Sequence, residues 1–276
     1  SLRVACYNET GETPQIVDVD EGVDLRAAQC SLGCLGIVTA VTLPCTPQYF
    51  VREKTTPCPS LDAVLALEPS SPLQQFFLFP HSWRFFAQER AVADEARRSP
   101  SAFLYRVYWM LALDIGIHLL IKLFVSLFHS RKWIHRLYRT IVPATLFPRW
   151  IVSDRSDRQL VMNHELFRHF EMELFVKRRD LPAAVRYLTD ILRWSDDAKY
   201  EWADETTDRL RPTQLRTAVE SLGGQFTHHY PICFRRVLTD DSLISMTSLS
   251  SEEVRDSTSA EAGRDDWFAI SLITYQ

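Results

Sequence analysis

The stretch QFFLFPHSWRFFAQ, residues 75–88, is the part of the sequence that decides the fold class. Residues 75–80 and 84–88 are both rich in aromatic side chains, and only a short connection separates them. Aromatic runs of this length on either side of a short connection predict the two strands of a β-hairpin. The strands of a hairpin pair antiparallel, so this stretch predicts an antiparallel sheet.

Further strands and helices are predicted on both sides of this hairpin. Alternating or β-branched patterns predict strands over residues 2–7, 15–19, 35–43, 170–176, 225–238 and 267–275. Capping residues and helical spacing predict helices over residues 24–29, 60–67, 180–194 and 213–222. The Pro-rich stretch 44–59 indicates a boundary between two parts of the chain. Together these elements predict an α+β fold with a large antiparallel sheet flanked by helices.

The composition is that of an ordinary globular protein. The chain has 276 residues, of which 46% are hydrophobic and 24% are charged, and its formal net charge is −4. This balance argues against disorder and against a general nucleic-acid binder. The six cysteines match no compact disulfide framework and indicate small buried thiols in a reducing compartment.

Residues 102–128 are the most apolar part of the chain and are long enough for a membrane-spanning helix. However, Asp114, His118, Lys122 and Ser126 recur every fourth residue, so they predict one polar stripe on a helix. Residues 101–150 carry seven Lys or Arg and one acidic residue, a net charge of +6, so the rest of the chain carries −10. The segment therefore fits either a helix at a membrane surface or a core-facing helix with a solvated edge. Nothing completes a metal site around Asp114 and His118, so we expect no metal.

Two candidate binding sites follow from the residues alone. Gly33 and Gly36 precede a β-branched strand, which would let the backbone approach a ligand, although such glycines are also common in plain turns. Cys233 and Arg235 point to the same face of a predicted strand. An Arg there either binds an anionic or polar ligand or reaches solvent at the strand edge.

The segment SLGCLGIVTAVTLPCTPQYFVREK, residues 31–54, resembles the end of the FAD-binding domain of sugar-1,4-lactone oxidases. These are the D-arabinono- and L-gulono-1,4-lactone oxidases, within the vanillyl-alcohol-oxidase-type flavoproteins. The blocks FFLFPHS (76–82), FEMELFVKRRDL (170–181) and HYPICFRRVLTDDSLIS (229–245) resemble later family segments in the same order. The resemblance covers essentially the whole chain.

The resemblance implies two domains and a fragment of a longer flavoprotein. Residues 1–50 would be the C-terminal edge of a PCMH-type FAD-binding domain. Residues 51–276 would be a cap or substrate domain, incomplete at its C-terminus, with an apolar-basic segment at 102–140. We expect this chain alone to be inactive.

The resemblance also implies the cofactor, the reaction and the site. FAD would take a hydride from a secondary hydroxyl carbon of an aldono-1,4-lactone, as in ascorbate biosynthesis, and oxygen or another acceptor would take the electrons. By position, Gly33, Gly36, Ile37 and Val38 would line the cofactor, and Glu173 falls on a commonly acidic position that would bind substrate. The family's active-site strand carries a Glu-x-Arg pair; Arg235 occupies the Arg position and Cys233 that of the Glu.

The cysteine at this position leaves alternatives open. A thiol cannot replace a carboxylate in a bidentate pair with Arg. The chain could therefore be an impaired family member that serves as a membrane-associated or interaction domain, or an unrelated α+β protein of the membrane surface. The expected partners are a small sugar lactone and an electron acceptor, with a membrane surface as a further candidate, and no nucleic acid. The expected location is a membrane or the cytoplasm.

Overall fold

A computed structural model describes residues 1–145, 150–161, 169–211, 213–248 and 266–275, without the side chains at 113, 114, 213 and 275. The chain divides into two units. Unit 1 contains Ser1–Pro47 and Val237–Trp267, and unit 2 contains Gln48–Arg236 and Phe268–Gln276. The return of residues 237–248 to unit 1 is a long-range contact that the sequence pattern does not indicate.

Unit 1 is built on a three-stranded antiparallel sheet in the order β2-β1-β3. Its elements are β1 (Leu2–Tyr7), β2 (Pro14–Val19), α1 (Gly22–Gln29) and β3 (Ile37–Val41). The returning segment contacts the helix, because the backbone N–H of Leu243 donates to the carbonyl of Arg26 at 3.2 Å. All five residues of β3 are exposed, so the apolar side chains of this strand are uncovered.

The described residues of unit 2 contain a larger sheet of seven strands in the order β7-β4-β6-β5-β9-β10-β8. The four pairings from β7 to β9 are antiparallel. This arrangement confirms the predicted α+β fold with a large antiparallel sheet. The strands are β4 (Phe50–Cys58), β5 (Gln75–Phe79), β6 (Arg84–Val92), β7 (Val152–Arg155), β8 (His169–Lys177), β9 (Ile232–Val237) and β10 (Trp267–Tyr275).

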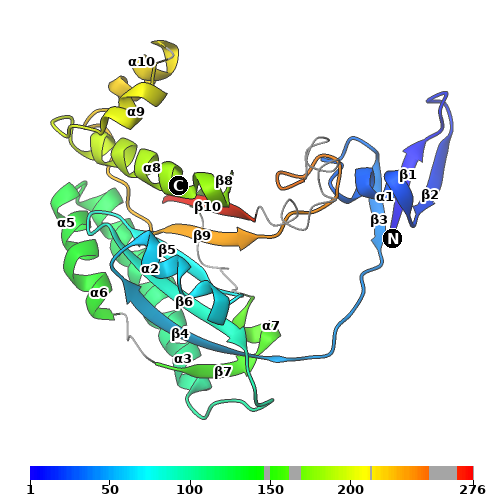
Figure 1. Cartoon of the computed structure of the whole chain (residues 1–276), viewed down its shortest axis with the longest axis horizontal. Helices are drawn as coiled ribbons and strands as arrows, with labels where there is room; N and C mark the ends of the chain where they lie inside the picture. Colours follow the sequence, from blue (N-terminus) through cyan, green and yellow to red (C-terminus); the bar gives the residue numbers. More distant parts are fainter. Residues whose placement is uncertain (146–149, 162–168, 212, 249–265, 276) are drawn as a thin grey trace. The chain divides into compact units, whose positions relative to one another are not determined.

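Helices lie on both faces of this sheet (Figure 1). Because side chains alternate along a strand, Phe76 and Leu78 pack on one face, while Phe77 and Phe79 pack on the other. The first face is covered by α2 (Leu61–Leu65) and α8 (Leu181–Asp196). The second is covered by a helical hairpin that extends from residue 102 to residue 145.

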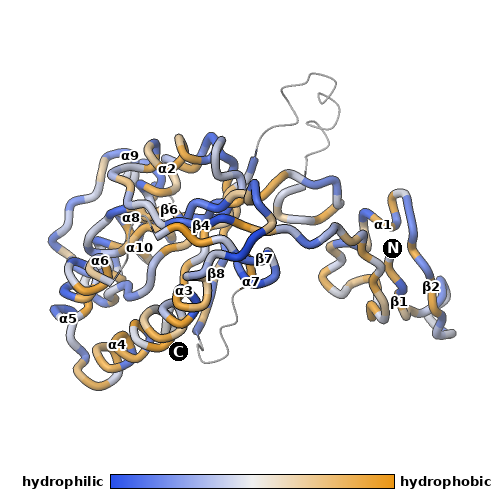
Figure 2. The backbone as a smooth tube through the Cα atoms, turned by 90° about the horizontal axis from the view of Figure 1, so that it is seen from below, coloured by the Kyte–Doolittle hydropathy of each residue, from blue (hydrophilic) through white to orange (hydrophobic). Residues whose placement is uncertain are grey.

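The first arm of this hairpin is a continuous helix, Ala102–Leu127, which Figure 2 shows as a largely hydrophobic run. It contains α3 (Ala102–Tyr108), η2 (Trp109–Ile117), α4 (His118–Lys122) and η3 (Leu123–Leu127), and η2 and η3 are π-helical. Among the described residues it is the one helix long and apolar enough to cross a membrane. Ile121 and Phe124 are nevertheless buried against the sheet.

The remaining described helices are short and connect these elements. They are η1 (Glu68–Ser70), α5 (Arg131–Arg136), η4 (Leu137–Ile141), α6 (Val142–Thr145), α7 (Ser156–Gln159), η5 (Arg178–Asp180), α9 (Asp204–Arg209) and α10 (Thr213–Ser221).

Three expectations from the sequence need correction. The chain divides into units between Pro47 and Gln48, inside the Pro-rich stretch 44–59 where a boundary was predicted, but the stretch also contains β4, which pairs on both sides within the sheet of unit 2. The strand predicted over 225–238 begins only at Ile232, because Phe226 donates its backbone N–H to Ser195 at the end of α8. All six cysteines are free as expected, but only Cys58 is buried, and Cys34 and Cys45 are exposed in unit 1.

Candidate functional site

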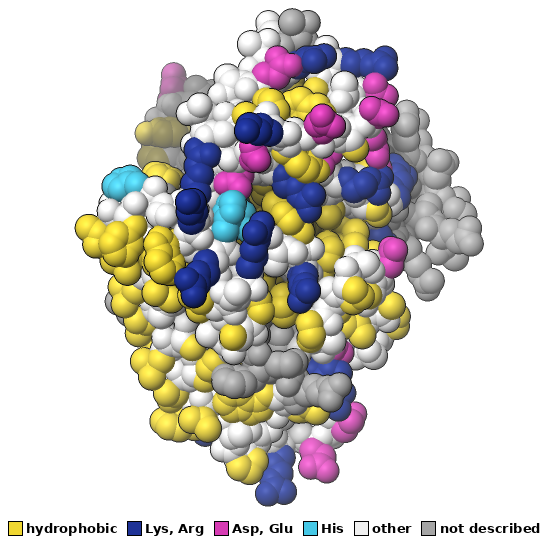
Figure 3. Space-filling model, turned by 90° about the vertical axis from the view of Figure 1, so that its left-hand side faces the viewer, with side chains coloured by type: hydrophobic (Ala, Val, Ile, Leu, Met, Phe, Trp, Pro, Cys, Tyr) yellow, Lys and Arg dark blue, Asp and Glu magenta, His cyan; other side chains and the backbone are white. Residues whose placement is uncertain are grey.

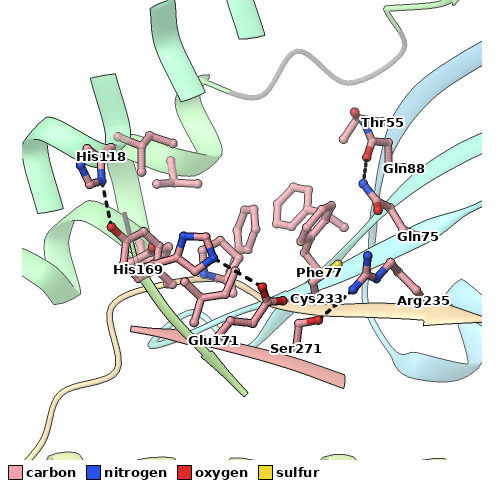
Figure 4. A pocket seen from close by; sticks show the side chains of 18 of the residues that line it. Thr55, Gln75, Phe77, Gln88, His118, His169, Glu171, Cys233, Arg235 and Ser271 are labelled. Carbon is pink, nitrogen blue, oxygen red and sulfur yellow. Dashed lines mark hydrogen bonds and ion pairs between the residues drawn. The ribbon is translucent and has the colours of Figure 1, made fainter. Parts of the chain in front are cut away.

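Unit 2 contains a cavity of about 360 Å³ between the sheet and the helical hairpin. Its walls are mostly aromatic and aliphatic, and polar side chains lie toward both ends (Figure 4). The apolar lining residues are Phe77, Phe79, Phe86, Trp109, Ile117, Tyr138, Val142, Tyr230, Pro231 and Ile273. An apolar hollow with a few convergent polar groups is typical of a small-molecule site.

The polar side chains on the cavity floor form a row across four strands. Thr55 on β4 lies opposite Gln88 on β6, Gln88 lies opposite Gln75 on β5, and Gln75 lies opposite Arg235 on β9. Residues directly opposite in antiparallel strands share one face, so the register places all four side chains on the same side of the sheet. The Gln75 amide donates to the Gln88 carbonyl oxygen, which fixes both side chains.

Arg235 is held at the end of this row by two neighbours. Its guanidinium forms an ion pair with Glu173 on β8 and donates to the Ser271 hydroxyl on β10 at 3.3 Å. Ser271 also donates to the same Glu173 carboxylate at 3.0 Å. The structure therefore brings two sequence-predicted site residues, Arg235 and Glu173, into direct contact. Arg235 lines the cavity, whereas Glu173 supports it from outside the lining.

Cys233 lines the cavity two residues before Arg235 and lies opposite Phe77 on β5. Its side chain is partly exposed to the cavity, but the cavity walls shield it from bulk solvent. This burial raises the pKa of the Cys233 thiol to about 12, in spite of the opposing charge of Arg235. The thiol is therefore neutral near pH 7 and cannot accept a proton there as a carboxylate would.

His118 and His169 lie toward the opposite end of the cavity from Arg235, and Glu171 lies between His169 and Ser271 (Figure 4). His169 Nε2 lies 3.4 Å from a carboxylate oxygen of Glu171, its neighbour on the same face of β8. His118 Nδ1 lies 3.1 Å from the Tyr230 hydroxyl. His118 belongs to the predicted polar stripe, and this member of the stripe faces the cavity. The side chain of Asp114, another member, lies outside the described residues.

A buried ionic network supports the cavity floor from the side of β4 and β6. The Glu53 carboxylate accepts hydrogen bonds from Arg90 at 2.6 Å, from Gln88 at 2.7 Å and from the Tyr105 hydroxyl at 2.5 Å. Glu53 and Arg90 are almost completely buried. Because Gln88 also bonds Gln75, this network connects the helix α3 to the polar row of the cavity.

The predicted cofactor residues Gly33, Gly36, Ile37 and Val38 belong to unit 1, and the cavity residues belong to unit 2. Gly36 has φ +122°, and a Cβ there would lie 2.4 Å from the Ala5 carbonyl oxygen on β1. Packing against β1 is therefore sufficient to require glycine at this position. Gly33 has φ +79° with open space around it, so its backbone is accessible.

Ile37 is 73% exposed and Val38 is 43% exposed on β3. The backbone at Gly33 is accessible, and the apolar side chains of Ile37 and Val38 are uncovered. These features fit one edge of a surface that a large planar cofactor could cover. These residues would form only one edge of a cofactor site. The described residues of unit 1 do not include a loop that binds the cofactor phosphates.

Sequence reasoning missed the histidines, Glu171, the Thr55–Gln88–Gln75 row and the Glu53 network. The polar residues Glu53, Thr55, Gln88 and Arg90 are visible in the sequence, but they stand among other polar residues of β4 and β6, such as Lys54 and Glu89. Their convergence also depends on the strand order, which the sequence pattern does not supply.

No family model matches the chain. It is 39% identical over 274 residues to a long-chain alcohol oxidase from an uncultured marine euryarchaeote. The match covers 99% of this chain and 54% of that protein. It is 24% and 26% identical over 226 residues to L-gulonolactone oxidases of Bos taurus and Mus musculus, covering 80% of this chain and 43% of each. The chain thus spans about half the length of the curated relatives it matches.

Two solved structures share the fold. A solvent-stable cholesterol oxidase matches with a TM-score of 0.60 at 13% identity, over 99% of this chain and 51% of that one. A cholesterol oxidase from B. sterolicum matches with a TM-score of 0.52 at 12% identity, over the same shares of the two chains. These likenesses support the α+β architecture.

Proposed function

We propose that this chain belongs to the vanillyl-alcohol-oxidase-type flavoprotein oxidases. On this premise, we propose that the protein containing it oxidises the hydroxyl-bearing carbon of a largely apolar alcohol. The observation that carries the proposal is the aromatic cavity of unit 2 with its polar end at Arg235. An apolar chain would occupy the aromatic walls, and its hydroxyl would lie among the polar side chains. The long-chain alcohol oxidase relative, with the higher identity, supports this choice.

Oxidation of an aldono-1,4-lactone, either D-arabinono- or L-gulono-1,4-lactone, is the competing substrate proposal. The row of Thr55, Gln88 and Gln75 favours it, because these side chains could bind the several hydroxyls of a sugar lactone. The L-gulonolactone oxidase relatives support it at lower identity.

FAD is the cofactor that we propose, with Gly33, Ile37 and Val38 of unit 1 at one edge of its site. When bound, it would accept the hydride and pass the electrons to oxygen or another acceptor. The residues of this chain bind and orient the substrate. Arg235, fixed by Glu173 and Ser271, donates hydrogen bonds to the substrate oxygen.

Glu171 is the group that we propose takes the hydroxyl proton. It lines the cavity between His169 and Ser271, and His169 Nε2 lies 3.4 Å from its carboxylate, where the imidazole can orient it. Cys233 cannot take this role because its thiol is protonated near pH 7. The aromatic walls exclude water from the substrate carbon.

The visible spectrum of the whole protein tests this function. We expect a flavin spectrum that bleaches under anaerobic conditions when a long-chain primary alcohol such as dodecanol is added, and that stays unchanged with either lactone. Bleaching by a lactone alone would favour the competing substrate. A bound flavin that no substrate bleaches would favour an impaired member of the family, and absence of flavin would refute the oxidase proposal.

Attachment to an anionic membrane surface is a second candidate function, and the helix Ala102–Leu127 suggests it. On the face drawn in Figure 3, hydrophobic side chains gather along one side and Lys and Arg side chains lie beside them. Because Ile121 and Phe124 are held in the core of unit 2, we propose that this helix lies on the bilayer and does not cross it. Its exposed apolar residues are Phe103, Leu104, Met110, Leu111, Leu119, Leu123 and Leu127, and the nearby exposed basic residues are Lys122, Arg131, Lys132 and Arg136.

Replacing Phe103, Leu104 and Leu111 together by Ser is expected to weaken binding to vesicles that contain phosphatidylserine by about 100-fold or more. The loss follows from the apolar surface that the three side chains would no longer insert. Co-sedimentation with vesicles measures it, and vesicles of phosphatidylcholine alone should bind the unchanged protein more weakly. The matched control is a variant with both Leu238→Ser and Met246→Ser, because these two residues of unit 1 are also apolar and exposed. Equal binding by the triple variant and the control would contradict the proposal.

A further inference from the structure

Outside the proposed substrate cavity, three potential metal ligands from distant parts of unit 2 converge. His81 lies in the turn between β5 and β6, His135 lies on α5, and Asp196 ends α8. One ligand atom from each lies within 4.8 Å of the other two. The proposed oxidation uses none of these residues.

The position of the His81 proton follows from its contacts. Its side chain is buried, and its Nε2 lies 2.8 Å from the carbonyl oxygen of His228. A carbonyl oxygen only accepts hydrogen bonds, so Nε2 carries the hydrogen and Nδ1 of the neutral ring carries a lone pair. Nδ1 faces the Asp196 carboxylate at 3.8 Å. The lone pair of His81 Nδ1 and the Asp196 carboxylate therefore face each other in a buried place, where a cation between them would be stabilised.

His135 adds an independent observation. Its Nε2 is buried and has no hydrogen-bond partner among the described residues, although Asp196 Oδ2 lies only 2.8 Å away. The close approach therefore lacks hydrogen-bond geometry. A buried polar atom without a hydrogen bond is costly, and a bound ion would satisfy it.

Hydrogen bonds to the atoms that would not bind the ion also orient two of the three ligands, as in established metal sites. Asp196 accepts a hydrogen bond from the Thr227 hydroxyl at 2.6 Å on its other oxygen, Oδ1, which leaves Oδ2 for an ion. The His228 carbonyl orients the His81 ring in the same way. Two ligands on a tetrahedral ion with bonds of about 2.1 Å lie roughly 3.4 Å apart, so binding requires His135, whose ring stacks on that of His81, to move by more than about 1 Å.

We propose that His81 Nδ1, His135 Nε2 and Asp196 Oδ2 bind a divalent first-row transition metal ion such as Zn²⁺. Two imidazoles and one carboxylate suit such ions, whereas Mg²⁺ and Ca²⁺ prefer sites made of oxygen. A cavity of about 310 Å³ adjoins His81 and Asp196, and Arg139 and Lys199 also line it. A water or a small anion from this cavity would complete the coordination.

The bound ion would connect the two helical layers of unit 2. Because α5 packs on one face of the sheet and α8 on the other, the site joins both layers to the turn between β5 and β6. A ligand that binds only the folded state stabilises it, so we expect the ion to raise the melting temperature.

Zinc titration of the full chain by calorimetry tests the site, in a background with Cys30, Cys34 and Cys45 replaced by Ser so that accessible thiols do not compete. We expect one equivalent of Zn²⁺ to bind and to raise the melting temperature. His135→Gln and, separately, Asp196→Asn should weaken binding at least about tenfold. His129→Gln, an exposed histidine close in sequence to His135, is the matched control and should bind as the background does.

Cobalt gives a second readout of the same ligands. Bound Co²⁺ should show the visible bands of nitrogen and oxygen ligands without thiolate charge-transfer absorption, and both ligand variants should abolish these bands. If Asp196→Asn does not fold by circular dichroism, the partly exposed His135→Gln variant decides. No zinc binding, or zinc binding that survives both variants, would overturn the proposal, and neither result bears on flavin reduction.

Discussion

Glu53→Ala is expected to lower the free energy of unfolding by about 3–5 kcal/mol, because it leaves the Arg90 guanidinium buried without its carboxylate. The Glu53 side chain is 2% exposed and that of Arg90 is 7% exposed, so water cannot replace the lost contact. The substitution also removes the acceptor of Gln88 and of the Tyr105 hydroxyl. Urea unfolding followed by circular dichroism measures the change.

Glu205→Ala is the matched control for this prediction. Glu205 also pairs with arginines, Arg186 and Arg209, but these contacts are on the surface of the same unit. Because exposed ion pairs contribute little, the control is expected to change the unfolding free energy by less than about 1 kcal/mol. Similar losses in the two variants would show that the Glu53 network does not have the stabilising role that its burial indicates.

Arg235→Met is expected to slow flavin reduction by about 100- to 1,000-fold, the usual cost of removing one hydrogen-bond donor aimed at a reacting oxygen. This prediction rests on the proposed function. Met keeps much of the length and apolar volume of Arg but supplies no donor to the substrate. Anaerobic stopped-flow mixing with the substrate that bleaches the flavin measures the rate.

Glu173→Gln separates the positioning of Arg235 from its direct contact with substrate. Since Glu173 acts through the guanidinium, we expect a smaller loss, about tenfold. Arg216→Met is the control, because Arg216 is an exposed arginine that pairs with Glu220 on α10. An unchanged reduction rate in Arg235→Met, with flavin still bound, would refute the role that we assign to this residue.

Much of the local structure could be predicted from the sequence because its causes are local. The hairpin of residues 75–88, the strand Trp267–Tyr275 and the helix Ala102–Leu127 follow from side-chain periodicity and turn residues. Strand β4 was missed because Pro57 and its neighbours indicate a boundary, whereas pairing with β6 and β7 overrides that local preference.

The candidate site could be predicted only in part. Cys233 and Arg235 share a face of β9 because strand side chains alternate, and this follows from the sequence alone. The contact of Arg235 with Glu173 joins residues that are 62 positions apart, and local periodicity says nothing about such a pair. It exists because β10 alone separates β9 from β8 in the sheet order.

The sequence by itself determined the class of the fold, the position of the apolar helix and the resemblance to a flavoprotein family. Only the tertiary structure decided which polar residues meet. The order and register of the strands place Thr55, Gln88, Gln75 and Arg235 in one row, and packing on both faces brings His81, His135 and Asp196 together. The physical reason is that periodicity fixes the face on which a side chain lies, whereas its partners depend on long-range pairing and burial.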